Sequence, residues 1–531
     1  MIYEIKEWSG GISSFSDRGI RGSFKMGKNL DIRKDVDTLT CGQALIEEGL
    51  LDTSHSSSSS ISQSSSLSPS SSTSASMSFS NSFSASQSPS GSASKSASKS
   101  ASPSGSTSPS SSPSPSLSPS AGLNNVYVDL VLFWVKATDG NTYGFGSAGN
   151  IYRRFSDGFT RNVYKVPGKI NGAIEKPSDK GKTYLQFVSG TTLYQKELPG
   201  ASDWSDVTEV ADNLTGTDWH TMVQVGGANY IANGNWLALC GYDDSWTNEA
   251  LDLIPGNTIK SLIERSGRAV IGTFKTGYPN KGTNAMIDAE YPLSQIGDDG
   301  NIFYTNFTDS LSVKRFPGGG RVNPGGVTNE IDQINIFSWE STSLSWIDKQ
   351  TIGSMTLWGI FNAEEGFNGV YTYGRKNKEQ PFTLNLEYAL EVDEIGAVAV
   401  VDGTTIISYR DGTDYGVKAV DSTTKVQGVY DSLEFRSPIK DAEVITTWGK
   451  AEILMEALPA GTSIEYFYKM NKSGDFKRAL TADGGESFNA IGGKKATFRI
   501  GAEGDIFEER IILNPAGNIS PTVLRSRVYF N

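Results

Sequence analysis

The stretch VYVDLVLFWVKATDGNTYGFGSAGNIYRRF at residues 126–155 decides the fold class. Three apolar and aromatic runs are separated by two short segments, ATDGN and SAGN, that contain glycine. β-branched and aromatic residues favour strands, and Gly-containing polar segments between such runs favour tight turns. The stretch therefore predicts a three-stranded antiparallel meander, and the sequence predicts an all-β protein.

Units of the same kind recur along the chain and predict a β-propeller. There are about seven of them at spacings of roughly 40 to 60 residues, which is the repeat signature of propeller blades. Closing a ring of blades hides the edges that a single blade would leave exposed. We therefore expect a propeller of about seven antiparallel blades over residues 122–427. The further units are KTYLQFVSGTTLYQKEL (182–198), MVQVGGANYIANGNWLALCGY (222–242), SLIERSGRAVIGTFK (261–275), SQIGDDGNIFYTNFTDSLSVKRF (294–316), TLWGIFNAEEGFNGVYTYGR (356–375) and AVAVVDGTTIISYRDGTDYGVKAV (397–420).

Longer units follow from residue 428 to residue 531 and predict a separate C-terminal β-sandwich. They include AEILMEALPAGTSIEYFYKM (451–470) and ATFRIGAEGDIFEERIILNP (496–515). Ile464, Tyr466 and Tyr468 alternate with Glu465 and Phe467, which predicts one packed face and one face toward solvent or a partner.

Residues 1–53 predict a docking segment that is too short to fold alone. The apolar residues from Leu30 to Leu45 alternate loosely, so we expect one or two strands, with a short helical turn near Gln43–Glu48. Such strands would complete the propeller or contact a partner.

The tract between these regions, residues 54–121, is a serine-rich low-complexity insertion. Serine occupies every even position from Ser54 to Ser120, and the odd positions are mostly small residues or proline. This composition cannot build a core and favours an extended, solvated backbone. We expect a semi-flexible tether; the alternatives are a tract that orders against a neighbouring subunit and one that carries O-linked sugar.

Charge and composition narrow the function classes. A net charge of −12 argues against nucleic-acid binding, which needs clustered Lys and Arg. The sequence has neither a membrane-length apolar run nor a secretory signal pattern, so we expect no membrane span and assembly in a cytoplasm. Cys41 and Cys240 are expected to be buried thiols. With only His55 and His220 as histidines, we expect no metal site, no cofactor and no Ser/His or Cys/His catalysis.

Acidic residues that lie side by side could in principle form a glycosidase site. A propeller glycosidase would need two carboxylates that face each other across a pocket. The adjacent pairs Asp243 with Asp244, Asp298 with Asp299, and Glu364 with Glu365 each lie in an expected turn, where acidic residues favour turn formation and solvation. We expect no catalytic residues and no enzymatic activity.

Aromatic side chains give the better binding signal. They gather in one region that spans neighbouring blades, and exposed tryptophans stack on sugars or anchor protein interfaces. The competing interpretation is that these rings fill the wedge between blades. The candidate ligand-binding residues are Trp204, Trp219, His220, Trp236, Tyr242 and Trp246.

The order of three features resembles virion structural proteins of tailed bacteriophages. They are the opening GGISSFSDRGIRGSFKMGKNLDIRKDVDTLTCGQAL, the blade turns in ATDGNTYGFGSAGNIYRR, and the closing segments LPAGTSIEYFYK and ILNPAGNISPTV. Many proteins of this family are non-enzymatic tail, nozzle or fibre-associated components. The resemblance implies that propeller and sandwich serve as assembly platforms and host-surface contacts, and it implies no catalytic residues.

Three functions remain as expectations. The first is a virion tail component, assembled in the host cytoplasm, whose partners are other virion proteins and further copies of itself as a homo-oligomer. A host-surface glycan is a further candidate partner. The second is a carbohydrate-binding or carbohydrate-cleaving surface protein. The third is a secreted adhesin with a glycosylated stalk, which the missing signal pattern disfavours.

Overall fold

All regular elements in the computed structural model are β-strands, within the part of the chain that it describes. The all-β expectation is therefore confirmed. Among the described residues there is no helix that is long and apolar enough to cross a membrane. The structure describes residues 1–8, 10–12, 23–32, 37–48, 127–155, 160–216, 220–253, 257–265, 268–275, 293–295, 302–307, 310–316, 333–338, 343–344, 350–352, 355–361, 368–374, 383–437 and 446–531.

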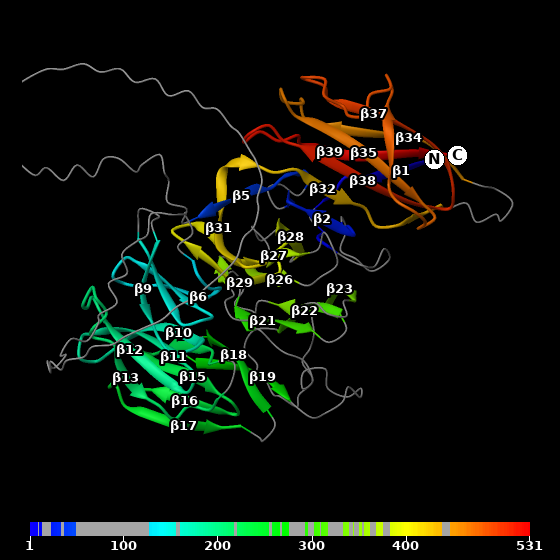
Figure 1. Ribbon diagram of the computed structural model, residues 1–531. Coiled ribbons are helices and arrows are strands. Elements are labelled where there is room, and N and C mark those ends of the chain that lie inside the picture. The colour runs from blue at the N-terminus through cyan, green and yellow to red at the C-terminus, as the bar shows by residue number, and fades with distance from the viewer. Residues whose placement is uncertain are drawn as a thin grey trace, which may run out of the picture. The chain divides into compact units, whose positions relative to one another are not determined.

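Blades 1, 2 and 3 are four-stranded antiparallel sheets in which each strand pairs with the next along the chain (Figure 1). Glycines make their tight turns: Gly149 has a φ of +87°, and a β-carbon there would lie 2.3 Å from the carbonyl oxygen of Val166. Only glycine fits such a position without strain. Blade 1 contains β6 (Val131–Lys136), β7 (Thr142–Gly146), β8 (Asn150–Arg154) and β9 (Thr160–Lys165); blade 2 contains β10 (Ile170–Pro177), β11 (Thr183–Ser189), β12 (Thr192–Leu198) and β13 (Thr208–Ala211); blade 3 contains β14 (Met222–Val225), β15 (Ala228–Asn233), β16 (Trp236–Cys240) and β17 (Trp246–Asp252).

The remaining described strands of this region continue the same arrangement, and inner strands of successive sheets contact one another. β6 contacts β10, β10 contacts β14, β14 contacts β18, β18 contacts β20, β20 contacts β25, and β26 contacts β29. Because β29 also contacts β6, the ring closes and the region is a β-propeller. The number of blades stays a prediction, because β18 and β19 are the only described strands of the fourth sheet. The bounds are β18 (Asn257–Arg265), β19 (Arg268–Lys275), β20 (Leu293–Gln295), β21 (Ile302–Phe307), β22 (Ser310–Phe316), β23 (Gln333–Ser338), β24 (Ser343–Leu344), β25 (Gln350–Ile352), β26 (Met355–Phe361), β27 (Gly369–Gly374), β28 (Thr383–Ala389), β29 (Glu394–Val401), β30 (Thr404–Asp411) and β31 (Asp414–Lys425).

The N-terminal segment supplies the outermost strand of the last blade. This strand, β5 (Gln43–Glu48), pairs antiparallel with β31, with Leu45 opposite Val420. The expected helical turn at Gln43–Glu48 is therefore wrong. The free edge of β31 offers a row of backbone partners, and this tertiary pairing overrides the local helical preference of the sequence QALIEE.

The two ends of the insertion between β5 and β6 lie next to each other. The Nε of Arg154 donates to Glu48 Oε1 at 2.6 Å. Tyr127 lies near both residues, because the charges of Glu48 and Arg154 both act on its hydroxyl group. Tyr127 also packs its ring 5.0 Å from that of Tyr152, next to Arg154 on β8. The chain therefore leaves the last blade and enters blade 1 at one place.

The C-terminal region forms two sheets joined through β36. The terminal sheet has the order β1-β39-β34-β37, and the bridging sheet has the order β35-β38-β32-β2; β36 pairs with both β35 and β37. In the terminal sheet β1 pairs antiparallel with β39, and the amino group of Met1 donates to the carbonyl oxygen of Phe530 at 2.6 Å. The bounds are β1 (Ile2–Ile5), β2 (Met26–Lys28), β3 (Leu30–Asp31), β4 (Thr40–Cys41), β32 (Gly428–Asp431), β33 (Phe435–Arg436), β34 (Thr447–Met455), β35 (Ser463–Met470), β36 (Lys477–Thr481), β37 (Lys495–Glu503), β38 (Ile506–Asn514) and β39 (Val523–Phe530).

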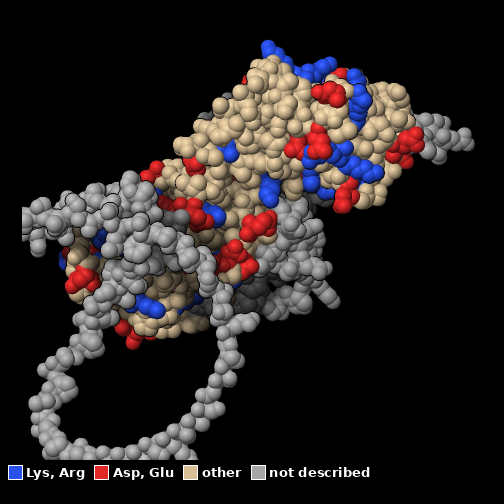
Figure 2. Space-filling view, turned by 45° about the horizontal axis from the view of Figure 1, so that its top comes forward, with Lys and Arg blue, Asp and Glu red and all other residues tan. Residues whose placement is uncertain are grey.

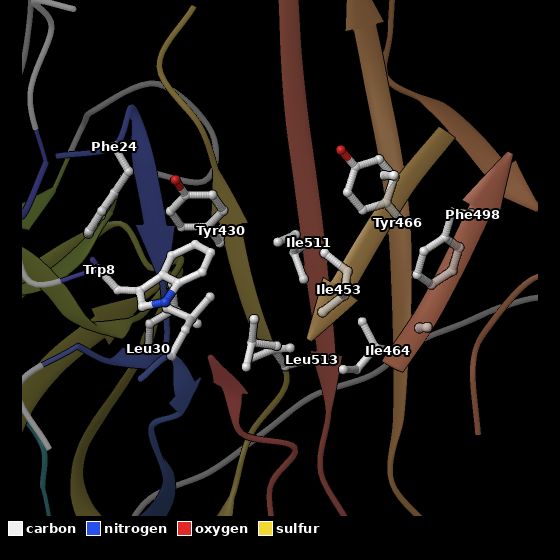
Figure 3. Close-up of a cluster of buried hydrophobic side chains, with 14 of the residues drawn as sticks. Trp8, Phe24, Leu30, Tyr430, Ile453, Ile464, Tyr466, Phe498, Ile511 and Leu513 are labelled. Atoms are coloured by element: carbon white, nitrogen blue, oxygen red, sulfur yellow. The ribbon is translucent and has the colours of Figure 1, made fainter. Parts of the chain in front are cut away.

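The core of this region draws on both ends of the chain. In Figure 3, Ile511 and Leu513 of β38 lie between two groups of buried side chains, one that includes Trp8 and Tyr430 and one that includes Tyr466. Ile464 and Tyr466 are fully buried on alternate positions of β35, as their spacing predicted. Because N-terminal rings are part of this core, residues 428–531 do not form their core alone.

The N-terminal segment also reaches the propeller through β2. This strand pairs antiparallel with β32 of the bridging sheet and parallel with β28, with Lys28 opposite Leu386. The Nδ2 of Asn385 donates to the Leu30 carbonyl oxygen at 3.1 Å. One short segment thus connects both folded regions through backbone pairing.

Candidate functional site

Trp204 fills the wedge between blades 1 and 2. The turn between β12 and β13 holds it at a φ of +61°, and its side chain is only 2% exposed. Its ring stacks on Tyr164 at 5.6 Å and meets Tyr143 edge-on at 5.7 Å, both from blade 1. The ammonium group of Lys196 lies 5.2 Å from the Trp204 ring centre, where the ring face attracts a cation. Trp204 is therefore a packing residue and not an exposed ligand contact.

His220 is fully buried between blades 2 and 3. Its Nδ1 lies 2.7 Å from the Ala232 carbonyl oxygen, its Nε2 lies 3.1 Å from that of Thr215, and its backbone N–H donates to Asn171. Burial lowers the pKa of the imidazole, although the neighbouring carbonyl groups oppose this shift. The expectation that His220 contacts a ligand is not met, because the ring joins backbone segments and has no exposed surface.

The remaining candidate aromatics do not converge. Trp236 and Trp246 lie at opposite ends of the β16–β17 hairpin, where they pair with Asp252 and Cys240, and both are half-buried. Tyr242 is 47% exposed and covers the backbone of Gly227. Trp219 lies outside the described residues. The described rings therefore form no common sugar-stacking platform.

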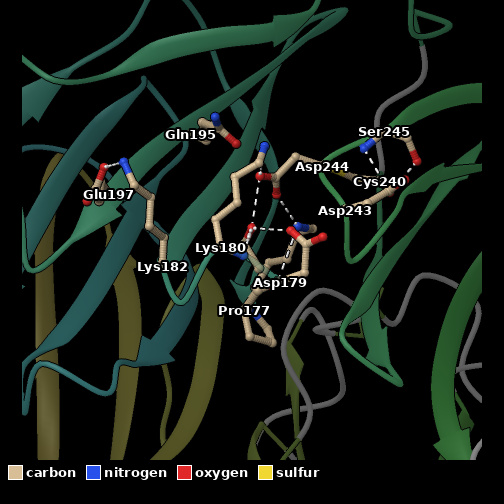
Figure 4. A network of polar contacts seen from close by, with 12 residues as sticks. Pro177, Asp179, Lys180, Lys182, Gln195, Glu197, Cys240, Asp243, Asp244 and Ser245 are labelled. Carbon is tan, nitrogen blue, oxygen red and sulfur yellow. Dashed lines mark hydrogen bonds and ion pairs between the residues drawn. The ribbon is translucent and has the colours of Figure 1, made fainter.

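A polar network joins blades 2 and 3 at the turn after β16 (Figure 4). Asp244, at a φ of +65°, accepts hydrogen bonds from Lys176 Nζ at 2.8 Å, Ser178 Oγ at 2.9 Å and Lys180 Nζ at 2.9 Å. The backbone N–H of Asp179 also donates to the Tyr242 carbonyl oxygen at 3.0 Å. We call these residues of blades 2 and 3 the inter-blade latch.

The electrostatics of the inter-blade latch favour its charged form. The Lys176 side chain is fully buried, so its ammonium needs a partner. Burial raises the pKa of Asp244, but the hydrogen bonds from Lys176, Lys180 and Ser178 outweigh it, and the pKa lies below its ordinary value. Asp244 is therefore a structural counter-charge.

A second buried lysine, Lys196 on β12, pairs with a carboxylate of its own blade, blade 2. Lys196, with a side chain 3% exposed, donates to Asp206 Oδ1 at 2.5 Å and to the Ala201 carbonyl oxygen at 2.8 Å. Neither Lys176 nor Lys196 was predicted from the sequence as a buried charge. The recurring spelling Asp-x-Ser, at 203–205 and again at 243–245, is the signal that could have marked the two turns.

Of the three adjacent carboxylate pairs, the structure describes Asp243 with Asp244, and Asp243 forms hydrogen bonds within its turn. Asp243 Oδ1 accepts from the Ser245 backbone N–H at 3.1 Å and from the Ser245 hydroxyl at 2.5 Å, which is the turn interaction expected for this residue. The other two pairs, at 298–299 and 364–365, lie outside the described residues. Among the residues that are described, no group of three or more His, Cys, Asp or Glu could hold a metal ion.

The two cysteines are unpaired and buried, as predicted. Burial raises the pKa of both thiols, and hydrogen bonds from Ser520 to Cys41 and from Gln186 to Cys240 only partly oppose it. Neither thiol has the lowered pKa that a nucleophile needs.

Comparisons with known proteins find similar folds and no family. No protein-family model matches the chain, and no curated protein matches it. A streptogramin B lyase is 15% identical with a TM-score of 0.38, over 56% of this chain and 95% of its own. A putative glucose dehydrogenase from Thermus thermophilus is 12% identical with a TM-score of 0.35, over 55% and 97%. A β-propeller domain from Myceliophteria thermophila is 9% identical with a TM-score of 0.37, over 55% and 96%.

Proposed function

We propose that this chain is a non-enzymatic structural component of a virion, namely a tail component of a tailed bacteriophage that serves as an assembly platform. The observation that carries the proposal is the double use of the N-terminal segment. Its β5 completes the last blade, while its β1 and β2 pair with β39 and β32 of the C-terminal region. Backbone hydrogen bonds from one N-terminal segment connect the two β regions. Such a connection favours a rigid protein, which a structural component of an assembly needs to be.

The described polar residues also favour a structural role. Buried Lys176 and Lys196 are neutralised within the fold, and buried Asp129 accepts hydrogen bonds from the Tyr152 hydroxyl at 2.5 Å and the Ala148 backbone N–H at 2.6 Å. The contacts of these three charged groups therefore stabilise the fold itself. The sugar-binding alternative has less support, because Trp204 and His220 are buried and the described aromatic rings do not converge.

Mass spectrometry of purified particles tests the proposal. The chain should be found in phage particles from the source and should remain with the tail fraction after capsids and tails are separated. Its absence from particles in which the other tail proteins are detected would contradict the proposal. Turnover of a bacterial polysaccharide by the purified chain would contradict its non-enzymatic part.

A further inference from the structure

Residues 1–48 depend on the rest of the chain for their structure. Three of their strands, β1, β2 and β5, pair with strands that lie between residues 383 and 531. The described strand pairing within the segment is limited to β3 with β4 and a single bridge between Ile12 and Phe24. We call residues 1–48 the donor segment and residues 127–531 the acceptor body. The donor segment takes most of its strand structure from the edges of the acceptor body.

The donor segment also fills a core of the acceptor body. Its Trp8, Phe24 and Leu30 are fully buried. The rings of Trp8 and Phe24 lie 5.0 Å and 5.6 Å from the ring of Tyr430, which belongs to β32. Removal of these side chains from water favours docking of the segment wherever an acceptor body is free.

Polar contacts fix the position of the donor segment. The Nζ of Lys25 pairs with Glu508 at 3.0 Å, and the Oδ1 of Asn29 accepts from the Ala389 backbone N–H at 2.9 Å. These contacts are specific for the side chains of the donor segment. Any acceptor body of the same sequence can make them, whether it belongs to the same chain or to another copy.

The connection between the two parts is far longer than a single chain needs. Glu48 and Tyr127 both lie near Arg154, so a few residues would join them within one chain, yet residues 49–126 number 78. As the flexible polar linker that its composition predicts, a tract of this length spans about 50 Å on average. That span is close to the width of roughly 55 Å expected for a compact protein of the acceptor body's size. Because a linker acts best when its average span matches the distance between two sites, its length suits a site on a neighbouring copy.

Strand exchange does not need a charged docking patch. Over the described part of the face in Figure 2, Lys and Arg side chains lie in small groups close to Asp and Glu side chains. The fields of opposite charges that lie close together largely cancel at a distance, and salt screens what remains. Backbone pairing and the burial of the donor segment's apolar side chains would hold two copies together without such a patch.

We infer that the donor segment docks on the acceptor body of a neighbouring copy of this chain, so that copies exchange their N-terminal strands. The exchanged contacts are those described above, with residues 1–48 supplied by one copy and residues 127–531 by the next. Reciprocal exchange gives a closed dimer, and exchange in one direction gives a ring or an open chain. The inference does not depend on a place in a virion, because purified chain would contain the exchanged contacts without other particle proteins.

Disulfide trapping between positions 2 and 529 tests the inference. Ile2 and Tyr529 lie opposite each other on β1 and β39. The adjacent pair, Met1 and Phe530, exchanges both backbone hydrogen bonds, at 2.6 Å and 3.1 Å. Because the two kinds of pair alternate along antiparallel strands, Ile2 and Tyr529 form a non-hydrogen-bonded pair, whose α-carbons lie about 4.5 Å apart and permit a disulfide.

A full-length chain with Ile2→Cys and a full-length chain with Tyr529→Cys, each with a different C-terminal affinity tag, are produced in the same cells and oxidised. Exchange should give a covalent heterodimer that is captured through one tag and detected through the other on a non-reducing gel. Deletion of residues 54–120 from both chains should reduce the heterodimer at least about tenfold. The eleven linker residues that remain span at most about 40 Å, which is less than the width of the acceptor body.

Two controls accompany this experiment. A single chain with Ile2→Cys/Tyr529→Cys shows whether its own two strands are paired, and circular dichroism shows that the variants fold. Ile2→Cys produced together with Leu480→Cys should give no heterodimer, because Leu480 is exposed but lies on β36, which β39, β34 and β37 separate from β1.

The inference is overturned if the Ile2→Cys/Tyr529→Cys chain forms its disulfide within single chains while the two single variants yield no heterodimer. A heterodimer that Leu480→Cys yields equally, or that survives the deletion undiminished, also overturns it. Sedimentation velocity of the wild type adds a measurement without new cysteines. Exchanged copies sediment as dimers or larger species, and a wild type that is monomeric at every concentration contradicts exchange.

Discussion

Glu509 lies on β38 in the core between the bridging and terminal sheets. Its carboxylate accepts from the Tyr466 hydroxyl of β35 at 2.6 Å and from the Ser526 hydroxyl of β39 at 2.7 Å, and its Oε1 has no hydrogen-bond partner within the described part of the chain. Burial raises the pKa of Tyr3 on β1 and of Tyr430 on β32, and the charge of Glu509 contributes to both shifts. Burial raises the pKa of Glu509 to about 7, and the two hydroxyl groups only partly oppose this shift.

The stability of the C-terminal region should therefore fall as pH rises from about 4.5 to about 7. A carboxyl whose pKa is raised by folding binds its proton more tightly in the folded state, so the folded state loses stability when that proton leaves. The shift corresponds to about 3 kcal/mol over this window. Thermal unfolding of the wild type and of Glu509→Gln across pH 4 to 8 measures the effect.

The difference between these two proteins isolates Glu509, because His220 acts in the opposite direction. The lowered pKa of His220 makes the fold lose stability as pH falls below about 6.5. Glu509→Gln should keep that acid-side loss and lack the loss toward pH 7. Identical pH profiles for the two proteins would show that Glu509 is not held protonated by burial.

Asp244→Ala should destabilise the propeller by about 3 kcal/mol, because it leaves the buried ammonium of Lys176 without its counter-charge. Asp243→Ala is the matched control: it removes the hydrogen bonds of an exposed turn and should cost about 1 kcal/mol or less. Chemical denaturation of both variants gives the comparison. An equal loss of unfolding free energy in the two variants would contradict a special contribution of the inter-blade latch to stability.

At the scale of elements, the strand β5 illustrates what a sequence does and does not reveal. The meanders over residues 126–155 and 182–198 were predictable because strands and turns adjoin in sequence, and their pairing is local. The strand at Gln43–Glu48 could not be predicted from a local pattern, because its partner, β31, lies far away in the chain. The buried positions of Trp204 and His220 likewise depend on a neighbouring blade, and no local pattern reports such a contact.

Leu45→Ser should loosen β5 from the last blade. Leu45 is half-buried and packs against a core that includes Ile395 and Ile407, so its loss should cost about 2 kcal/mol locally. Hydrogen exchange should then rise in β5 and along β31. The neighbouring Ile46 is 50% exposed, so Ile46→Ser should leave exchange in both strands unchanged; a similar rise in both variants would argue against this packing.

At the scale of the whole molecule, the stability of the fold depends more on where the insertion lies than on how long it is. Glu48 and Tyr127 both lie near Arg154, so the chain needs only a short connection between them. The cost of closing a loop grows slowly with its length, and a shorter loop costs less. We therefore expect residues 1–48 and 127–531 to fold without the serine-rich tract.

Deletion of residues 54–120 should leave the midpoint of thermal unfolding within a few degrees of the wild type. The remaining residues of the insertion still connect β5 to β6, so both strands should keep their partners. Differential scanning calorimetry of the two proteins provides the comparison. A midpoint lowered by more than a few degrees would show that the tract packs on the folded regions.

The pairing of β1 with β39 has a mechanical consequence. Because the two strands run antiparallel, with Ile2 opposite Tyr529, a pull that separates residues 1 and 531 loads the hydrogen bonds of this pair one after another and not all together. Bonds that are loaded in series give way at low force. Tension between these two residues would therefore peel β1 from the terminal sheet first, while the ring of blades stayed unloaded.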